Sequence, residues 1–259
     1  MEPDLSLGVD IGSRTTKIVA LRNGAIAHAE VFDTTPDPLP ALLEKLAAWP
    51  GAFIMATGYG RRLLEKAASA SVVTEIKACA RGAHFLRPAC RLVIDIGGQD
   101  AKVVRVRPDG GFDDFELNDR CSAGTGRFLE VMARALNYSL DDFCREAMQA
   151  DRPAAVSSMC TVFAESEVVA MLAAGEDRKR LALGLYESIV DRVYPLISRL
   201  ETDGEIVFCG GVARSRCMAG LLRRKLKRDI TVPPYPQILS ALGAALSLGG
   251  QVSTFDKDL

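Results

Sequence analysis

The chain has 259 residues, 48% of them hydrophobic and 25% charged, which is the composition of a soluble globular protein with a sizeable core. Its 32 basic and 33 acidic residues leave a formal net charge of −1, so no electrostatic footprint for a nucleic-acid partner is present. The N-terminal residues lack the basic-then-apolar order of a signal peptide, and the longest apolar stretch, around Ile238 to Leu248, is too short to cross a bilayer, so we expect a cytoplasmic protein without a membrane partner.

The first predicted element is a β-hairpin, and it occurs twice. The segment from Val9 to Val19 can be laid over the segment from Ile94 to Val104. In each copy an apolar strand ends in Asp, passes through a glycine turn and returns as a β-branched run, which is typical of a hairpin. The residue pairs that coincide are Asp10 and Asp95, Gly12 and Gly97, and Lys17 and Lys102. The repeat predicts two related lobes.

The other predicted elements follow hydrophobic periodicity and turn residues. After the first hairpin we expect a strand over Ala25 to Phe32, a helix over Pro38 to Trp49, a strand over Ala52 to Ala56, helices over Gly60 to Ala70 and Glu75 to Leu86, and a strand over Arg91 to Asp95. After the second we expect a strand over Phe112 to Leu117, helices over Gly126 to Asn137, from Ser139 onward, over Thr161 to Ala174 and over Arg178 to about Leu200, and a βαβα run over Glu205 to Cys209, Ala213 to Lys227, Asp229 to Val232 and Gln237 to Leu248.

This order predicts an α/β fold of two lobes. The first lobe is expected to comprise residues 1–92 and 243–259, and the second to comprise residues 93–242.

Both hairpin turns have the chemistry of a phosphate site. Glycine lets backbone N–H groups approach phosphate oxygens, because no Cβ blocks the approach. We assign Asp10 and Asp95 to Mg²⁺, Lys17 to charge neutralisation and Gln99 to the orientation of an attacking water. The predicted nucleotide contacts are Gly12, Ser13, Arg14, Thr15, Thr16, Lys17, Gly97, Gly98, Gln99, Gly124, Thr125, Gly126, Gly210 and Gly211.

A third glycine element follows the predicted strand at Val207 to Cys209. Gly210 and Gly211 stand between this strand and a helix, a junction suited to the adenosine part of a nucleotide. The three elements in this order resemble the ATPase superfamily of acetate and sugar kinases, Hsp70 and actin. That resemblance implies a two-lobed actin/Hsp70-like (ribonuclease H-like) fold with ATP held between the lobes.

Seven cysteines form an odd set, and a disulfide framework is not expected in a reducing compartment. Cys121 and Cys160 each stand just before a predicted helix, where a thiolate is stabilised. Two cysteines cannot complete a [4Fe–4S] cluster, but a two-fold dimer supplies four. We interpret the other five as small buried hydrophobes: Cys79, Cys90, Cys144, Cys209 and Cys217.

Long motifs carry a more specific resemblance. They are Ala56 to Arg61, Val93 to Asp100, Asn118 to Phe128 and Cys160 to Glu167. These motifs resemble the activators of 2-hydroxyacyl-CoA dehydratases, whose relatives include ATPase subunits of benzoyl-CoA reductase, and the similarity runs from about Leu7 to Leu248. Arg14 departs from relatives, in which the hairpin tip is often small, and Glu165 is a candidate for support of the cluster site.

By that resemblance, Cys121 and Cys160 are the ligands of a [4Fe–4S] cluster shared by a homodimer. The protein is then expected to hydrolyse ATP with Mg²⁺ and to pass single electrons from ferredoxin or flavodoxin to a 2-hydroxyacyl-CoA dehydratase-type acceptor. A benzoyl-CoA reductase-type acceptor or another double-cluster protein remains open. So do two functions of other classes, a small-molecule kinase and an ATP-dependent switch without redox chemistry.

Overall fold

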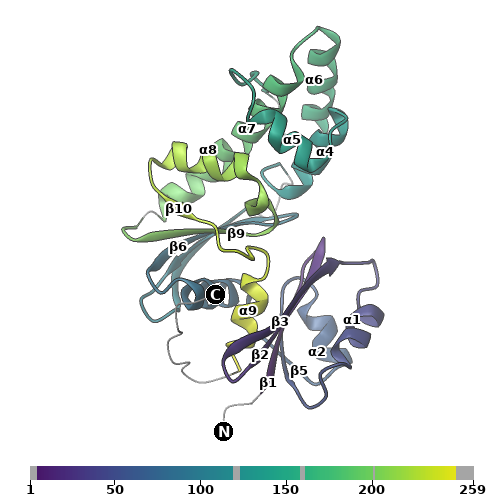
Figure 1. Cartoon of the computed structure of the whole chain (residues 1–259), viewed down its shortest axis with the longest axis vertical. Helices are drawn as coiled ribbons and strands as arrows, with labels where there is room; N and C mark the ends of the chain where they lie inside the picture. The colour runs from purple at the N-terminus through teal and green to yellow at the C-terminus, as the bar shows by residue number, and fades with distance from the viewer. Residues whose placement is uncertain (1–4, 119–122, 158–160, 201, 249–259) are drawn as a thin grey trace. The chain divides into compact units, whose positions relative to one another are not determined.

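The computed structural model describes residues 5–118, 123–157, 161–200 and 202–248 (Figure 1). The chain divides into two compact units. Unit 1 comprises Met1–Pro88, Asp109–Phe112 and Gln237–Leu259, and unit 2 comprises Ala89–Pro108 and Asp113–Pro236. Within the described ranges, no helix has the length and apolarity that a bilayer crossing requires.

Unit 1 is built on a five-stranded mixed sheet in the order β3-β2-β1-β4-β5. Strand β1 pairs antiparallel with β2 and parallel with β4, while β2 pairs antiparallel with β3, and β4 pairs parallel with β5. The strands are β1 (Leu5–Ile11), β2 (Thr15–Arg22), β3 (Ala25–Asp33), β4 (Phe53–Thr57) and β5 (Ala70–Val72).

Helices cover both faces of this sheet. Helices α1 (Leu39–Leu46) and α2 (Arg61–Ala67) bury Leu42, Leu46 and Leu64 in one cluster with strands β1 and β2. On the other face, apolar residues of helix α9 (Leu239–Ala245) pack with Val19 and Leu21, and Phe85 of helix α3 (Glu75–Leu86) joins them. The result is a three-layer α/β/α arrangement.

Glycines bring α9 unusually close to its neighbours. A Cβ built on Gly8 of β1 would lie 1.8 Å from the Ala241 carbonyl oxygen, and one on Gly243 would lie 1.7 Å from the Ala78 carbonyl oxygen. A Cβ on Gly82 of α3 would likewise lie 2.1 Å from the Leu239 carbonyl oxygen. Side chains at these positions would force the backbones apart, so the packing depends on their absence.

Unit 2 repeats this sheet. Its strand order is β10-β9-β6-β7-β8, in which β6 pairs antiparallel with β7 and parallel with β9. In each sheet, three sequential strands are followed by a fourth that pairs parallel with the first and a fifth that pairs parallel with the fourth. The strands are β6 (Cys90–Ile96), β7 (Ala101–Val106), β8 (Phe112–Asn118), β9 (Glu205–Cys209) and β10 (Ile230–Thr231).

The helices of unit 2 share one large core with the sheet, in which Ile94 and Val103 of the sheet pack with Phe128, Phe143 and Tyr186 of the helices. The helices are α4 (Gly126–Ala135), α5 (Leu140–Ala147), α6 (Thr161–Ala173), α7 (Arg178–Arg199) and α8 (Arg216–Leu226). Helices α4 to α7 are inserted between β8 and β9, where unit 1 has only α1.

Two predicted helices are wrong in detail. The helix expected over Gly60 to Ala70 ends at Ala67, and Ala70 instead begins β5, which pairs with β4. The helix expected over Ala213 to Lys227 is a 3-10 helix at Gly211–Arg214 followed by α8. Ser215 separates the two because its extended backbone and its side chain, which accepts a hydrogen bond from the Met218 amide, form the N-cap of α8.

Candidate functional site

The first hairpin places Asp10 opposite Lys17. The two residues are register partners on β1 and β2, and Lys17 Nζ lies 3.0 Å from Asp10 Oδ2. Asp10 is 4% exposed. At the turn the Gly12 amide donates to the Thr15 carbonyl oxygen at 3.2 Å, which leaves Ser13 and Arg14 at the exposed tip.

The second hairpin repeats this geometry with a difference. Asp95 and Lys102 are again register partners, but Lys102 Nζ lies 2.7 Å from Asp100 Oδ2 and 3.8 Å from Asp95 Oδ2. The Gly97 amide donates to the Asp100 carbonyl oxygen at 2.9 Å. Gln99 is exposed at the tip, where its amide can reach a ligand in solvent.

A glycine after the parallel neighbour strand lies against each aspartate. Gly58 follows β4 with φ +83°, and a Cβ built on it would lie 2.4 Å from Asp10 Oδ1. Gly210 follows β9 with φ +86°, and a Cβ built on it would lie 2.3 Å from Asp95 Oδ1. Each aspartate thus has a backbone segment pressed against one carboxylate oxygen, which only glycine permits at this φ.

Two buried oxygens in unit 1 have no hydrogen-bond partner in the part of the chain that the structure describes. They are Asp10 Oδ1 and Thr57 Oγ1. Asp10 and Thr57 are register partners on β1 and β4, so their side chains lie on the same face of the sheet. Buried polar groups without partners are rare and costly. A carboxylate oxygen is the ligand that Mg²⁺ prefers, so these residues fit a hydrated magnesium ion.

The remaining predicted contacts of the first hairpin differ in their exposure. Thr15 is half-buried. Thr16 is fully buried, and its hydroxyl lies 2.9 Å from the hydroxyl of Thr34. The Thr16 hydroxyl therefore already has a hydrogen-bonding neighbour within the protein.

The contacts predicted after the second hairpin meet at the start of α4. The Gly126 amide donates to the Gly97 carbonyl oxygen at 2.8 Å, and the Arg127 amide donates to the Gly98 carbonyl oxygen at 2.9 Å. Thr125, the N-cap of α4, is fully buried. The first turn of α4 is therefore hydrogen-bonded directly to the tip of the second hairpin.

Gly124 and the glycine pair after β9 take part in close contacts. Gly124 has φ +106°, and a Cβ on it would lie 2.7 Å from Cδ of Arg192. The Gly210 amide donates to the Pro236 carbonyl oxygen at 2.9 Å, which ties this turn to the segment before α9. Gly211 begins the 3-10 helix.

The predicted cluster ligands Cys121 and Cys160 lie outside the described residues. Of the chain around Cys160, Ser157 donates through both its amide and its hydroxyl to Glu167 Oε1, each at 2.8 Å. Glu165, the residue considered for support of the cluster site, is exposed. Glu167 is therefore the acid that contacts the segment leading to Cys160.

The structure also shows contacts with the predicted site by residues to which the sequence assigned no role. These are Thr57, Gly58, Asp100, Lys102 and Glu167. The motif from Ala56 to Arg61 contained a signal for the first two, because an apolar strand followed by Gly-x-Gly is typical of close backbone approach. The aspartate that this backbone approaches is far away in sequence, so the contact itself could not be predicted.

Comparison with known proteins connects this geometry to a family. The chain is 41% identical to the activator of lactoyl-CoA dehydratase from Anaerotignum propionicum over 250 residues, covering 93% of this chain and 96% of that protein. It is 29% identical to one of the subunits of benzoyl-CoA reductase from Thauera aromatica over 262 residues, covering 93% of this chain and 92% of that protein.

A solved structure confirms the predicted fold. The activator of the 2-hydroxyisocaproyl-CoA dehydratase from Clostridium difficile, with bound ADPNP, superposes with a TM-score of 0.87 at 37% identity, covering 94% of each chain. The predicted resemblance to dehydratase activators is thereby confirmed. The family model that matches residues 7–247 shows that this chain belongs to the BadF/BadG/BcrA/BcrD ATPase family.

Proposed function

We propose that this protein is an ATP-hydrolysing activator that passes single low-potential electrons from ferredoxin or flavodoxin to a 2-hydroxyacyl-CoA dehydratase-type metalloprotein. The similarity to activators of such dehydratases supports the choice of acceptor. The observation that carries the ATPase part is the matched pair of buried aspartates, each covered by a positive-φ glycine.

In this proposal the two hairpins hold MgATP. Asp10 and Asp95 would hold the hydrated Mg²⁺, Lys17 would neutralise phosphate charge, and Gln99 would orient the attacking water. Phosphoryl transfer needs little covalent chemistry from a protein, so positioning and electrostatics supply most of the rate. The exposed tips at Ser13 and Gln99, beside buried carboxylates, provide both solvent access and fixed charge.

The remaining nucleotide contacts follow the backbone. The amides of Gly12 and Gly97 are engaged within their turns, so the backbone of the turn residues that follow them would approach the phosphates, and the segment at Gly210 and Gly211 would approach the adenosine part. Gly126 is hydrogen-bonded to Gly97 of the second hairpin, and Gly124 and Thr125 directly precede it, so all three are assigned to the site. A structural change at the hairpin when ATP binds or is hydrolysed would thereby be transmitted to α4 and to the preceding segment, which contains Cys121.

Cys121 and Cys160 would hold half of a [4Fe–4S] cluster, and a homodimer would complete it. Such a cluster, when bound, accepts and releases one electron at a time. The support for this assignment is the sequence setting of both thiols, each just before a helix that begins at Gly126 or Thr161. Ser157, three residues before Cys160, donates to Glu167 of α6.

Anaerobic purification tests the redox part. We expect brown protein with about four irons per dimer, and loss of iron in Cys121→Ala and in Cys160→Ala. Cys90→Ala is the matched control, because Cys90 is a buried thiol within β6 and should leave the iron content unchanged. Colourless wild-type protein without iron after anaerobic reconstitution would contradict the proposal.

Activity assays separate the alternatives. With ATP and a reductant, the protein should restore activity to an inactive 2-hydroxyacyl-CoA dehydratase and release free phosphate. The similarity to a component of the Thauera aromatica benzoyl-CoA reductase favours a benzoyl-CoA reductase-type acceptor as the second candidate. Transfer of phosphate to an added small molecule would indicate a kinase, and ATP turnover without iron would indicate a non-redox switch.

A further inference from the structure

Two cysteines without a role in the proposed function meet at the N-terminus of α8. Cys144 lies on α5, and Cys217 is the second residue of α8. The Cys217 amide donates to Cys144 Sγ at 3.5 Å. Because Cβ of Cys217 is only two bonds from that nitrogen, rotation of the side chains can bring the two sulfurs together.

Polar groups surround the Cys144 sulfur. The Ser215 hydroxyl lies 3.3 Å from Cys144 Sγ and 3.1 Å from the Tyr186 hydroxyl. Ser215 Oγ also accepts a hydrogen bond from the Met218 amide. The sulfur of Cys144 therefore accepts N–H and O–H hydrogen bonds at a helix N-terminus. This is the setting in which reactive cysteines are found.

The two thiols differ in their access to solvent. Cys144 is half-buried, whereas Cys217 is 4% exposed and belongs to the core of unit 2. Burial, together with the neighbouring Cys144, raises the pKa of Cys217 to about 12. A small oxidant should therefore react first with Cys144, and Cys217 is placed to react second.

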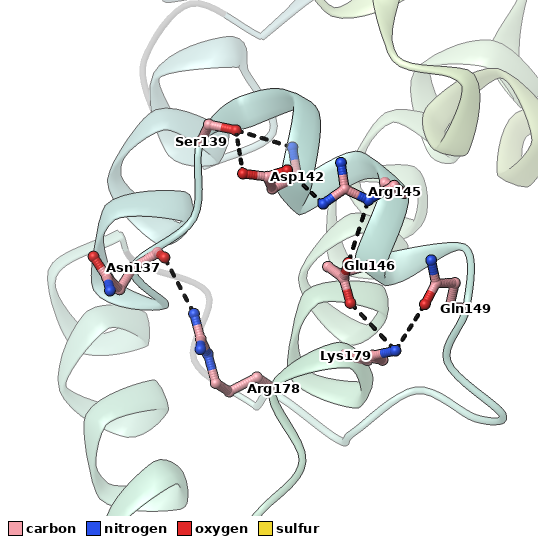
Figure 2. Close-up of polar contacts among 8 residues, drawn as sticks. All are labelled: Asn137, Ser139, Asp142, Arg145, Glu146, Gln149, Arg178 and Lys179. Atoms are coloured by element: carbon pink, nitrogen blue, oxygen red, sulfur yellow. Dashed lines mark hydrogen bonds and ion pairs between the residues drawn. The ribbon is translucent and has the colours of Figure 1, made fainter.

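A polar network links side chains of α5 to one another and to α7 (Figure 2). Lys179 of α7 binds Glu146 at 3.3 Å and Gln149 at 2.7 Å, and Arg145 binds Glu146 at 3.3 Å and Asp142 at 2.5 Å. The Arg145 guanidinium is thus engaged along α5. The contacts of Lys179 tie α5, which carries Cys144, to α7.

We propose that Cys144 and Cys217 form a peroxide-sensitive dithiol site that closes to a disulfide between α5 and α8. In the first step, the Cys144 thiolate attacks one oxygen of hydrogen peroxide and the O–O bond breaks. The departing hydroxide takes up a proton to become water, and Cys144 becomes a sulfenic acid.

In the second step the Cys217 sulfur attacks the Cys144 sulfur. The S–O bond breaks, and the hydroxide leaves with the proton of the Cys217 thiol as a second water. Two thiols and one peroxide thus give one disulfide and two waters, which balances the two electrons transferred. The site depends neither on the nucleotide nor on Cys121 and Cys160.

Peptide mapping of the full-length protein after treatment with hydrogen peroxide tests this site. Trypsin should place Cys144 in the peptide of residues 135–145 and Cys217 in that of residues 217–223. We expect these peptides to be linked in the wild type and in the control Cys90→Ser, and separate after dithiothreitol. The linked pair should be absent from Cys144→Ser and from Cys217→Ser.

Dimedone, which reacts with sulfenic acids, examines the first step separately. It should label Cys144 in Cys217→Ser, because the resolving thiol is missing. Linkage of Cys144 to any other cysteine, or irreversible oxidation of Cys144 with Cys217 still reduced in the wild type, would overturn the proposal. If Cys217→Ser does not fold, the wild-type map alone decides between these outcomes.

Discussion

The Gly126 amide donates to the Gly97 carbonyl oxygen at 2.8 Å, so the start of α4 is bonded directly to the tip of the second hairpin. The neighbouring bond from Arg127 to Gly98, at 2.9 Å, reinforces the connection. A change at the hairpin tip therefore reaches α4 through two backbone hydrogen bonds.

Replacing Gly126 tests this connection. Gly126→Pro removes the amide at the first position of α4, where proline is otherwise tolerated. Loss of one hydrogen bond, about 1 kcal/mol, should speed amide exchange in α4 by about fivefold in the presence of MgATP. Gly126→Ala keeps the amide and is the control. Equal exchange in both variants, measured by mass spectrometry, would argue against the coupling.

The carboxylates are tested by isosteric replacement. Asp10→Asn and Asp95→Asn should lower ATP turnover by about a hundredfold or more, because each removes a negative charge assigned to Mg²⁺. Phosphate release measures this, and iron content should not change. Asp114→Asn, at an exposed position on β8, is the control. Full turnover in either variant would refute the Mg²⁺ assignment for that residue.

The glycines beside the aspartates should be intolerant of a side chain. Gly58→Ala and Gly210→Ala combine a positive φ with Cβ contacts of 2.4 and 2.3 Å. Gly51 and Gly175 also have positive φ but no atom within 4 Å of a built Cβ, so alanine there isolates the backbone strain. Denaturant unfolding should show that the free energy of unfolding falls by about 1 kcal/mol in the controls. It should fall by about 1–3 kcal/mol more in Gly58→Ala and Gly210→Ala. If the free energy of unfolding falls equally in all four variants, the aspartates move aside for the added methyl group at no cost.

The hydroxyl of Thr57 should stabilise the protein only when a ligand is bound. Thr57→Val removes a buried oxygen without a hydrogen-bond partner among the described residues, so the ligand-free protein should gain stability, by about 1 kcal/mol. The rise in Tm that MgATP produces should shrink, and Thr57→Ser should restore it. An undiminished MgATP effect in Thr57→Val would exclude this residue from the site.

The N-cap of α5 predicts a pH effect. The Ser139 hydroxyl, followed by Arg145, holds the pKa of Asp142 below its ordinary value of 3.8. A carboxyl with a lowered pKa in the folded state stabilises the protein above that ordinary value, and the contribution disappears as the pH falls through the lowered pKa. Ser139→Ala should raise the pKa of Asp142, as measured by NMR titration, whereas Ser198→Ala on α7 should leave it unchanged.

The hairpins could be predicted because their residues are local in sequence. Asp10, Gly12 and Lys17 recur with the same spacing in the second copy, and spacing is what a sequence shows. The match between Gly58 and Gly210 was not visible, because it depends on parallel pairing of β4 with β1 and of β9 with β6. In unit 2, helices α4 to α7 lie in the chain between β6 and β9. The spacing from aspartate to glycine therefore differs between the two units, and the sequence repeat does not extend to the glycines.

Short elements were missed for a different reason. Strand β5 has three residues, too few to show alternation, and it exists because β4 offers an edge for pairing. The N-cap at Ser215 had a sequence signal, a serine before a helix, but the apolar residues of the 3-10 helix before it continued the helical pattern.

The glycine contacts of α9 also have a consequence for the order in which the protein folds. Unit 1 needs α9 against β1 and α3, yet α9 comes after every strand of unit 2 in the chain. A ribosome therefore releases all the strands of unit 2 before the last helix of unit 1 exists. Since domains fold as units during synthesis, unit 2 is free to finish first, and the N-terminal strands must wait for the other end of the chain.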